Sequence, residues 1–154
     1  MVAVKEASPG DSIALNPNET SVAVLPFVNM SDDKQNEYFS DGISEELLNV
    51  LVRIEGLRVP SRTSSFTFKG SGKKVTEIGK DLQVDHVLEG SVRKAGDRNR
   101  VTAQLIDVDT DTHLWSETYT RELDDIFAVQ DEIAQAIVGA LKVTLTGAEE
   151  KSLT

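Results

Sequence analysis

Apolar residues first gather in a short, nearly continuous run at residues 22–27, which only Pro26 interrupts. After Val28, the mostly polar stretch 29–36 follows. A short apolar run that is bounded by polar residues is typical of a strand buried on both faces of a sheet. The pattern therefore predicts a first strand in the centre of the sheet.

The next apolar residues recur at helical spacing and predict a helix that Asp41 caps. Glu45 and Glu46 would fall in its first turn, where the helix dipole favours acidic side chains, and Gly56 would end it. The apolar face of this helix would consist of Ile43, Leu47, Leu51 and Ile54.

Residues 57–62 predict a short strand, and residues 61–65 predict a hydroxyl-rich turn. Phe66 and Phe68 alternate with polar residues after this turn. Helical spacing then returns in a short second helix, in which Gly79 would let another part of the backbone approach closely. The apolar positions of this helix are Val75, Ile78 and Leu82.

From Asp85 onward the period of the apolar residues changes to two, which predicts strands. Polar turns at 95–99 and 109–112 separate the alternating stretches. Three adjacent strands joined by short turns form a meander. The stretches are 87–92, 101–106 and 114–120.

A final amphipathic helix is predicted after Asp124 or Asp125. Its apolar positions, each four residues from the last, are Val129, Ile133, Ile137 and Leu141. The whole pattern predicts a single α/β domain with a mixed sheet of about five strands and about three helices packed on it. The predicted order of elements is β-α-β-α-β-β-β-α.

The charge of the chain argues against nucleic acid as a partner. It has 26 acidic and 16 basic residues, hence a formal net charge of -10. This charge repels phosphate, and no block of Lys and Arg offsets it, so we expect the domain to contact no nucleic acid. No apolar stretch approaches the roughly 20 residues of a membrane span, so we expect no membrane insertion by this chain.

Composition divides the chain into three parts. Residues 1–20 are predicted to be a flexible linker, residues 21–146 the α/β domain, and residues 147–154 the start of a connector to a further carboxy-terminal region. The first part has no basic segment followed by an apolar core, so it is not predicted to be a signal peptide.

The aspartates at the second turn of the meander have the spacing of a calcium loop but lack its other ligands. Asp107, Asp109 and Asp111 match its first half, whereas Thr112 replaces the glycine and Thr118 the final glutamate. Aspartate is also a common turn residue, because its side chain hydrogen-bonds to nearby backbone. We therefore predict a turn and no metal site.

Other catalytic or ligand-binding motifs are incomplete as well. Residues 70–74 lack the glycine of a phosphate loop at Thr67 and its hydroxyl residue at Lys74. His86 and His113 have no zinc-ligand spacing, and no G-x-S-x-G elbow is present. The chain has no cysteine, which excludes disulfides and thiolate chemistry. We predict no enzyme, no cofactor and no catalytic residue.

Several motifs in the same order along the chain resemble the TolB amino-terminal-like domain family. The resemblance runs from residue 21 to about residue 146. Its motifs are SVAVLPFVNMS (21–31), EYFSDGISEEL (37–47), GLRVPSRTSS (56–65), VLEGSVR (87–93), RVTAQLID (100–107), HLWSETY (113–119) and DIFAVQDEI (125–133).

The resemblance implies an architecture rather than a reaction. Domains of this family commonly lie between an output module, either a winged-helix DNA-binding domain or a class III adenylate cyclase domain, and tetratricopeptide repeats. A single membrane span often precedes them. The resemblance therefore implies a bacterial signalling protein with this domain on the periplasmic side of a membrane, the cytoplasm being the alternative.

Two functions remain open at this point. In the first, the domain binds another protein or a second copy of itself, as a homodimer, through the sheet edge or the last helix. In the second, it is a sensor that binds a small molecule at the carboxyl ends of the parallel strands. The residues predicted to rim such a pocket are Asn29, Ser31, Asp41, Arg62 and Ser64.

Overall fold

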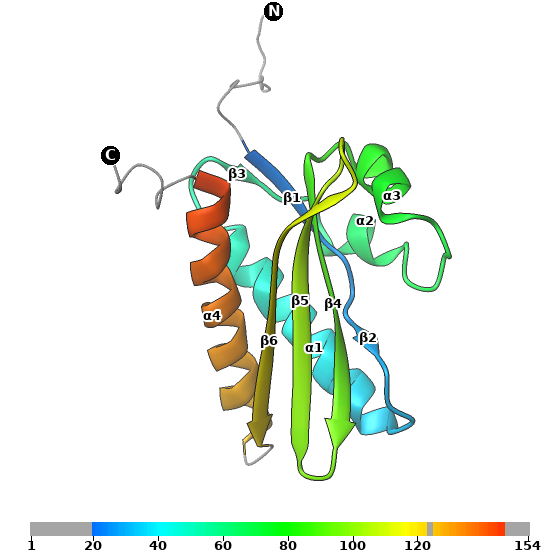
Figure 1. The fold of residues 1–154 in the computed structure, drawn as a ribbon, viewed down its shortest axis with the longest axis vertical. Coiled ribbons are helices and arrows are strands. Elements are labelled where there is room, and N and C mark those ends of the chain that lie inside the picture. The colour runs from blue at the N-terminus through cyan, green and yellow to red at the C-terminus, as the bar shows by residue number, and fades with distance from the viewer. Residues whose placement is uncertain (1–19, 123–124, 147–154) are drawn as a thin grey trace, which may run out of the picture.

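The computed structural model describes residues 20–122 and 125–146, and in these ranges a mixed six-stranded sheet packs with four helices (Figure 1). This architecture confirms the predicted α/β class. The strands are β1 (Thr20–Val24), β2 (Val28–Asn29), β3 (Leu57–Arg58), β4 (His86–Ala95), β5 (Arg98–Asp107) and β6 (Thr112–Glu122). The helices are α1 (Lys34–Leu51), α2 (Arg62–Phe66), α3 (Val75–Leu82) and α4 (Ile126–Thr146).

The strand order places β1 inside the sheet, as its apolar run predicts. The order is β3-β1-β4-β5-β6, and β2 pairs with β4. Strand β1 is parallel to both of its neighbours, whereas β4, β5 and β6 form the predicted antiparallel meander. Val22 and Val24 are buried in the main core, and Ala23 and Leu25 are buried in a smaller cluster on the other face.

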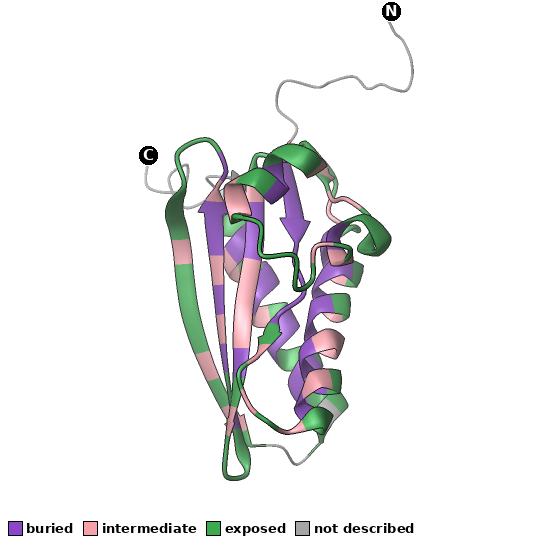
Figure 2. Ribbon diagram, turned by 90° about the vertical axis from the view of Figure 1, so that its right-hand side faces the viewer, coloured by how far each residue is buried: buried purple, intermediate pink, exposed green. Residues whose placement is uncertain are grey.

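The two faces of the sheet are covered unequally (Figure 2). Helices α1 and α4 lie together on one face and enclose the main core. Helix α3 covers the other face only near β1 and the start of β4. Farther along, that second face carries polar side chains, among them Glu89, Thr102 and Gln104, in place of a helix.

Helix α1 begins earlier than predicted, because Asp33 caps it and Asp41 does not. The Asp33 carboxylate accepts a hydrogen bond of 2.9 Å from the backbone N–H of Gln35. Asp41 lies inside the helix, and Glu45 and Glu46 lie well past its first turn. The prediction was wrong because polar side chains share the buried face of the first turns with apolar ones: Asn36, Ser40 and Ser44.

Helix α1 also ends earlier than predicted, at Leu51. Ile54 still packs against the main core, but from the turn that follows the helix. Gly56 has a φ of 84°, in the left-handed region that glycine adopts without a steric penalty. Its role is therefore to turn the chain into β3 rather than to end the helix.

The segment after β3 is more helical than predicted. The strand expected over 57–62 is only the two-residue β3, and the turn expected at 61–65 is largely helix α2. Ser61 caps α2 by accepting a hydrogen bond of 3.2 Å from the backbone N–H of Ser64. Serine favours both turns and helix caps for the same reason, so composition could not distinguish them. Phe66 belongs to this helix and is not extended.

Helix α3 confirms the predicted second helix and the role of its glycine. Gly79 faces Val108, and a Cβ atom at position 79 would collide with the Val108 side chain. The close approach is therefore real, although the neighbour is a side chain rather than the predicted backbone. It brings α3 against the smaller cluster.

Helix α4 confirms the predicted final helix. The Asp125 carboxylate accepts a hydrogen bond of 3.2 Å from the backbone N–H of Ala128, whereas Asp124 lies outside the described residues. The four predicted apolar positions of α4 are all buried: Val129, Ile133, Ile137 and Leu141.

The predicted ends of the domain fall mostly outside the described residues. Of the linker predicted over 1–20 only Thr20 is described, and the connector predicted over 147–154 is not described at all. Both therefore stay predictions. None of the helices in the described residues is long and apolar enough to span a bilayer.

Candidate functional site

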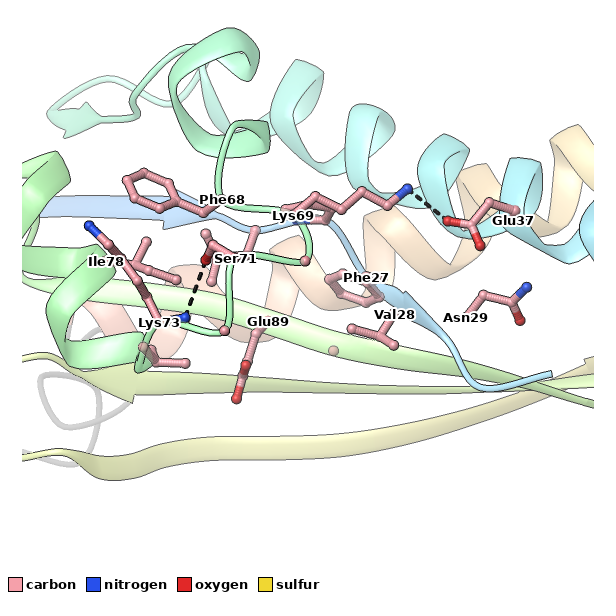
Figure 3. A pocket seen from close by; sticks show the side chains of 16 residues that line it. Phe27, Val28, Asn29, Glu37, Phe68, Lys69, Ser71, Lys73, Ile78 and Glu89 are labelled. Carbon is pink, nitrogen blue, oxygen red and sulfur yellow. Dashed lines mark hydrogen bonds and ion pairs between the residues drawn. The ribbon is translucent and has the colours of Figure 1, made fainter. Parts of the chain in front are cut away.

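A cavity of about 390 Å³ lies beside the segment that joins β1 to β2 (Figure 3). We call it the loop cavity, because the loop at residues 68–73 forms its opposite wall. The start of α3 and the middle of β4 complete it. Its volume falls within the range of small-molecule sites. Apolar lining comes mainly from Leu25, Phe27, Val28, Phe68, Val75 and Ile78.

The floor of the loop cavity is held in place by buried contacts. The backbone N–H of Phe27 donates a hydrogen bond of 2.9 Å to the Ser44 hydroxyl of α1. The Phe27 ring lies against Gly90 of β4, where a Cβ atom would collide with the ring and with the carbonyl oxygen of Thr102. These contacts attach this floor to α1 and pack it closely against β4.

The loop wall contains two glycines and an ion-paired lysine. Gly70 and Gly72 have φ angles of 72° and 75°, which other residues adopt with strain. The Lys69 ammonium contacts the Glu37 carboxylate at 2.7 Å and the Asp41 carboxylate at 3.1 Å, both on α1. These contacts close the loop over the end of the cavity, as Figure 3 shows for Lys69 and Glu37.

Both lysines that line the loop cavity, Lys69 and Lys73, are ion-paired with nearby carboxylates. The hydrogen bond from Lys69 lowers the pKa of Glu37, and the same contact raises the pKa of Lys69. The ion pair of Lys73 with Asp81, at 2.8 Å, raises the pKa of the lysine. Glu89 accepts a hydrogen bond of 2.7 Å from Gln104. Because the lining is mainly apolar and both lysines are already ion-paired, the cavity suits an uncharged, mostly apolar ligand better than an anionic one.

Asn29 and Ser31, two of the predicted rim residues, lie close together at the start of α1. Both line a shallow pocket of about 320 Å³, and Asn29 also lines the loop cavity. Their polar atoms mainly hold the backbone: Asn29 accepts from the N–H of Ser31, and Ser31 accepts from the N–H of Lys94. Lys94 also binds Asp33 at 2.9 Å, which lowers the pKa of that carboxyl group.

The other three predicted rim residues do not join them. Asp41 binds Lys69, as described above. Arg62 lines a separate pocket of about 150 Å³ and contacts the Glu45 carboxylate at 3.3 Å. The Ser64 side chain hydrogen-bonds to Ser61 within α2. The structure therefore places the five residues at different sites rather than around one pocket.

Sequence reasoning missed the residues that form the loop cavity. Lys69 and Glu37 are far apart in the sequence, and neither segment contains a pattern that predicts their contact. The two glycines of the 70–74 motif were the available signal, because glycines that flank a short loop often mark special backbone conformations. The sequence of residues 70–74 predicts only a solvated basic loop, because the phosphate-loop pattern is incomplete.

The second candidate site is the outer edge of β6. This strand pairs with β5 along one side, and among the described strands it is the last of the sheet. None of its eleven residues is fully buried. Trp115 and Tyr119 are half-buried against the main core, and burial raises the pKa of Tyr119. Arg121 contacts Glu132 of α4 at 2.9 Å.

The turn before β6 has the geometry of a structural turn. The Asp107 carboxylate accepts hydrogen bonds from the backbone N–H groups of Asp109 and Thr110. Asp111 has a φ of 55°, which aspartate tolerates better than most residues. Across residues 20–122 and 125–146, no group of three or more His, Cys, Asp or Glu could hold a metal ion.

Sequence comparisons match the chain to a family of transcriptional-regulator domains and to a protein named as an adenylate cyclase. The family model described as "HilA/YgeH-like transcriptional regulator, second domain" matches residues 18–136. A protein named "Putative adenylate cyclase 3", from Rhizobium meliloti (strain 1021), is 50% identical over 135 residues. The match covers 88% of this chain and 23% of that protein, so the chain spans about a quarter of the length of this relative.

Structural comparisons show a TolB-like fold. TolB from Acinetobacter baumannii has a TM-score of 0.59 at 16% identity, over 84% of this chain and 29% of TolB. Lipoprotein GNA1162 from Neisseria meningitidis has a TM-score of 0.56 at 20% identity, over 80% of this chain and 96% of the lipoprotein. The resemblance to TolB is thus confirmed for the fold, while the matching family model has a different description.

Proposed function

The chain belongs to the family of HilA/YgeH-like transcriptional regulator second domains, and we propose that it is a non-catalytic interaction domain that relays a signal through the free edge of β6. The relative named as an adenylate cyclase is about four times as long as the matched region. A domain of this kind would connect a partner to an output module elsewhere in a longer bacterial protein.

The observation that carries this proposal is the contrast between the two ends of the sheet. Strand β3, at one end, has only two residues, and short edge strands are a common protection against unwanted pairing. Strand β6, at the other end, has eleven residues and no proline. Its backbone groups on the outer side can accept another strand, which is how many domains bind protein partners.

We propose an adenylate cyclase or a DNA-binding domain as the output module. The similarity to the protein named as an adenylate cyclase supports the first, and the description of the family supports the second. The periplasmic side of a membrane-anchored protein is the proposed location, from the resemblance to TolB amino-terminal-like domains, and the cytoplasm is the alternative.

The edge can be tested in the longer protein that contains this domain. A lysine on an edge strand discourages strand addition, so we expect Thr118→Lys to change the output, measured as cyclic AMP or as reporter transcription. Val52→Lys introduces the same residue at an exposed position of α1's end and should leave the output at the wild-type level. Equal output from both variants and the wild type would exclude the β6 edge.

A small-molecule sensor is the second candidate function, and the loop cavity is the observation that favours it. A thermal-shift screen of neutral, mostly apolar compounds would identify a ligand. Val28→Trp should fill the cavity and remove the shift, whereas Met30→Trp, at a similarly exposed position outside the cavity lining, should keep it. Arg62→Ala should also keep it, because Arg62 lines another pocket.

A further inference from the structure

We propose that the partner at the β6 edge is a second copy of this chain, with the two β6 strands antiparallel about a two-fold axis at Tyr119. This inference rests on the proposed function, because it uses the same edge. It adds the identity of the partner and the register of the pairing. Antiparallel pairing of identical strands gives a closed, self-complementary interface, the commonest kind in homodimers.

The alternation of side chains along β6 fixes which residues can meet in such a pair. Trp115 and Tyr119 point toward the helix-covered face, where they contact the main core, so Glu117 and Arg121 belong to the same face. Thr118 belongs to the open face, where its hydroxyl lies 3.3 Å from that of Thr102. If both copies keep their helices on one side of the joined sheet, residues of the same face stand opposite each other.

Charge complementarity selects the register. With the axis at Tyr119, Glu117 of each copy stands opposite Arg121 of the other, which gives two equivalent ion pairs. Glu117 is exposed and has no ion pair within the described part of the chain. Arg121 already contacts Glu132 of α4 through Nε at 2.9 Å, and one of its terminal nitrogens donates to the carbonyl oxygen of Thr120. A second carboxylate can bind the remaining N–H donors of that guanidinium.

Registers with the axis at Glu117, Thr118 or Arg121 are less favourable. An axis at Glu117 would oppose two carboxylates, and an axis at Arg121 would oppose two guanidinium groups, and like charges directly across a pair are destabilising. An axis at Thr118 would place the charged Glu122 opposite the apolar Leu114, which gives no ion pair. The Tyr119 register instead places two half-buried phenol rings together at the centre, where aromatic cross-strand pairs add stability.

Sedimentation equilibrium over a concentration series tests the dimer. Because each copy carries a charge of -10, the experiment needs about 0.15 M salt, at which charges more than about 8 Å apart are largely screened. We expect a reversible dimer, and Glu117→Lys should weaken it at least about tenfold, because it opposes Lys to Arg twice. Glu55→Lys makes the same charge change at an exposed turn far from β6 in the sequence and should leave the dimer intact.

Crosslinking through introduced cysteines tests the register. The chain has no native cysteine, so only the introduced thiols can react. Tyr119→Cys places two thiols at the axis, so a short bis-maleimide should join the copies. Ser116→Cys, three residues away on the same strand, is separated from its equivalent by about 20 Å in this register and should not crosslink. Crosslinking through Cys at 116 but not at 119 would overturn the register.

The outcomes separate this inference from the proposed function. A strict monomer, or a dimer that Glu117→Lys leaves unchanged, would overturn pairing through β6 of a second copy. The proposed function would still stand if Thr118→Lys altered the output of the longer protein, because the edge would then bind a different partner. Failure of both experiments would overturn both.

Discussion

Strands β4 and β6 pair with the two edges of β5, but they differ in their other strand partners and in how far their side chains are exposed. Strand β4 has ten residues and β6 has eleven, and both run antiparallel to β5. On its far side β4 also pairs with β1 and β2, whereas β6 is the last strand of the sheet. Leu88 of β4 is 0% exposed, and Leu114 of β6 is 45% exposed.

The difference shows that position in the sheet, rather than residue type, separates the strand that holds the fold from the strand that is free to bind. Each strand contains two adjacent apolar residues that include a leucine, Val87 and Leu88 in β4 and Leu114 and Trp115 in β6. Of the two, only β4 pairs with other strands along both backbone edges, and its Leu88 and Val92 are buried in the main core. Substitutions in β4 should therefore change stability, and substitutions in β6 should mainly change association.

The largest expected effect comes from truncating the same residue type in each strand. Leu88→Ala should lower the free energy of unfolding by about 3 kcal/mol, because it removes a fully buried side chain and leaves a cavity. Leu114→Ala should lower it by about 0.5 kcal/mol or less, as is usual at exposed positions. Urea denaturation of both variants measures the contrast. Similar losses would mean that β6 is buried in solution.

Strand β5, which lies between β4 and β6, contains a buried asparagine. Its substitution by an apolar residue should raise the free energy of unfolding rather than lower it. Asn99 of β5 is 0% exposed, pairs with Lys94 and Arg121, and its side-chain amide hydrogen-bonds to no described residue. Asn99→Leu keeps the branched shape and removes the unsatisfied polar atoms, so it should stabilise the fold by about 1 kcal/mol. Thermal unfolding measures the change, and a clear loss of stability would show that the amide is hydrogen-bonded in solution.

The smallest expected effect concerns the ion pair of Glu37 and Lys69, on the β1 side of the sheet. The pKa of Glu37 is lowered from its ordinary value of 4.5, so its contribution is complete above that value and is lost as the pH falls through the lowered pKa. The pKa of Lys69 is raised from 10.5, so its contribution is lost only as the pH rises through the raised value. Between these limits the contribution is constant.

Glu37→Gln should remove this acid dependence from the melting temperature measured between pH 3 and 7. The loss at neutral pH should stay below about 1 kcal/mol, because both side chains are more than 40% exposed and solvent screens the pair. Glu46→Gln is a matched control on the same helix, because Glu46 has no ion pair within the described residues. Equal acid dependence in the two variants would contradict the assignment to Glu37.

The fold could be predicted where one face of an element is uniformly apolar. The run at 22–27 and the spacing of Ile133 and Ile137 predicted β1 and α4, because burial follows the period directly. The start of α1 could not be predicted this way. Ser40 and Ser44 are buried there and donate hydrogen bonds to backbone carbonyls one turn earlier, so the buried face looks polar in the sequence.

The candidate site was harder to predict than the fold. Asn29 lines the loop cavity at the end of β2, a parallel strand, and its role in binding stays a prediction. Arg62 and Ser64 were placed on the same rim because their segment was interpreted as a loop, but it is helix α2. The Lys69 contact depends on how a glycine loop folds over α1, and no local pattern encodes such a contact.

The path of the chain has a consequence for how paired copies would be arranged in space. Thr20, where β1 begins, and Thr146, where α4 ends, lie at the same end of the molecule, and the turn between β4 and β5 lies at the other (Figure 1). Such a domain can be inserted into a longer chain without separating the flanking segments. Two copies that pair antiparallel through β6 would point these ends in opposite directions. The pair would therefore act as a bridge that holds the attached modules apart.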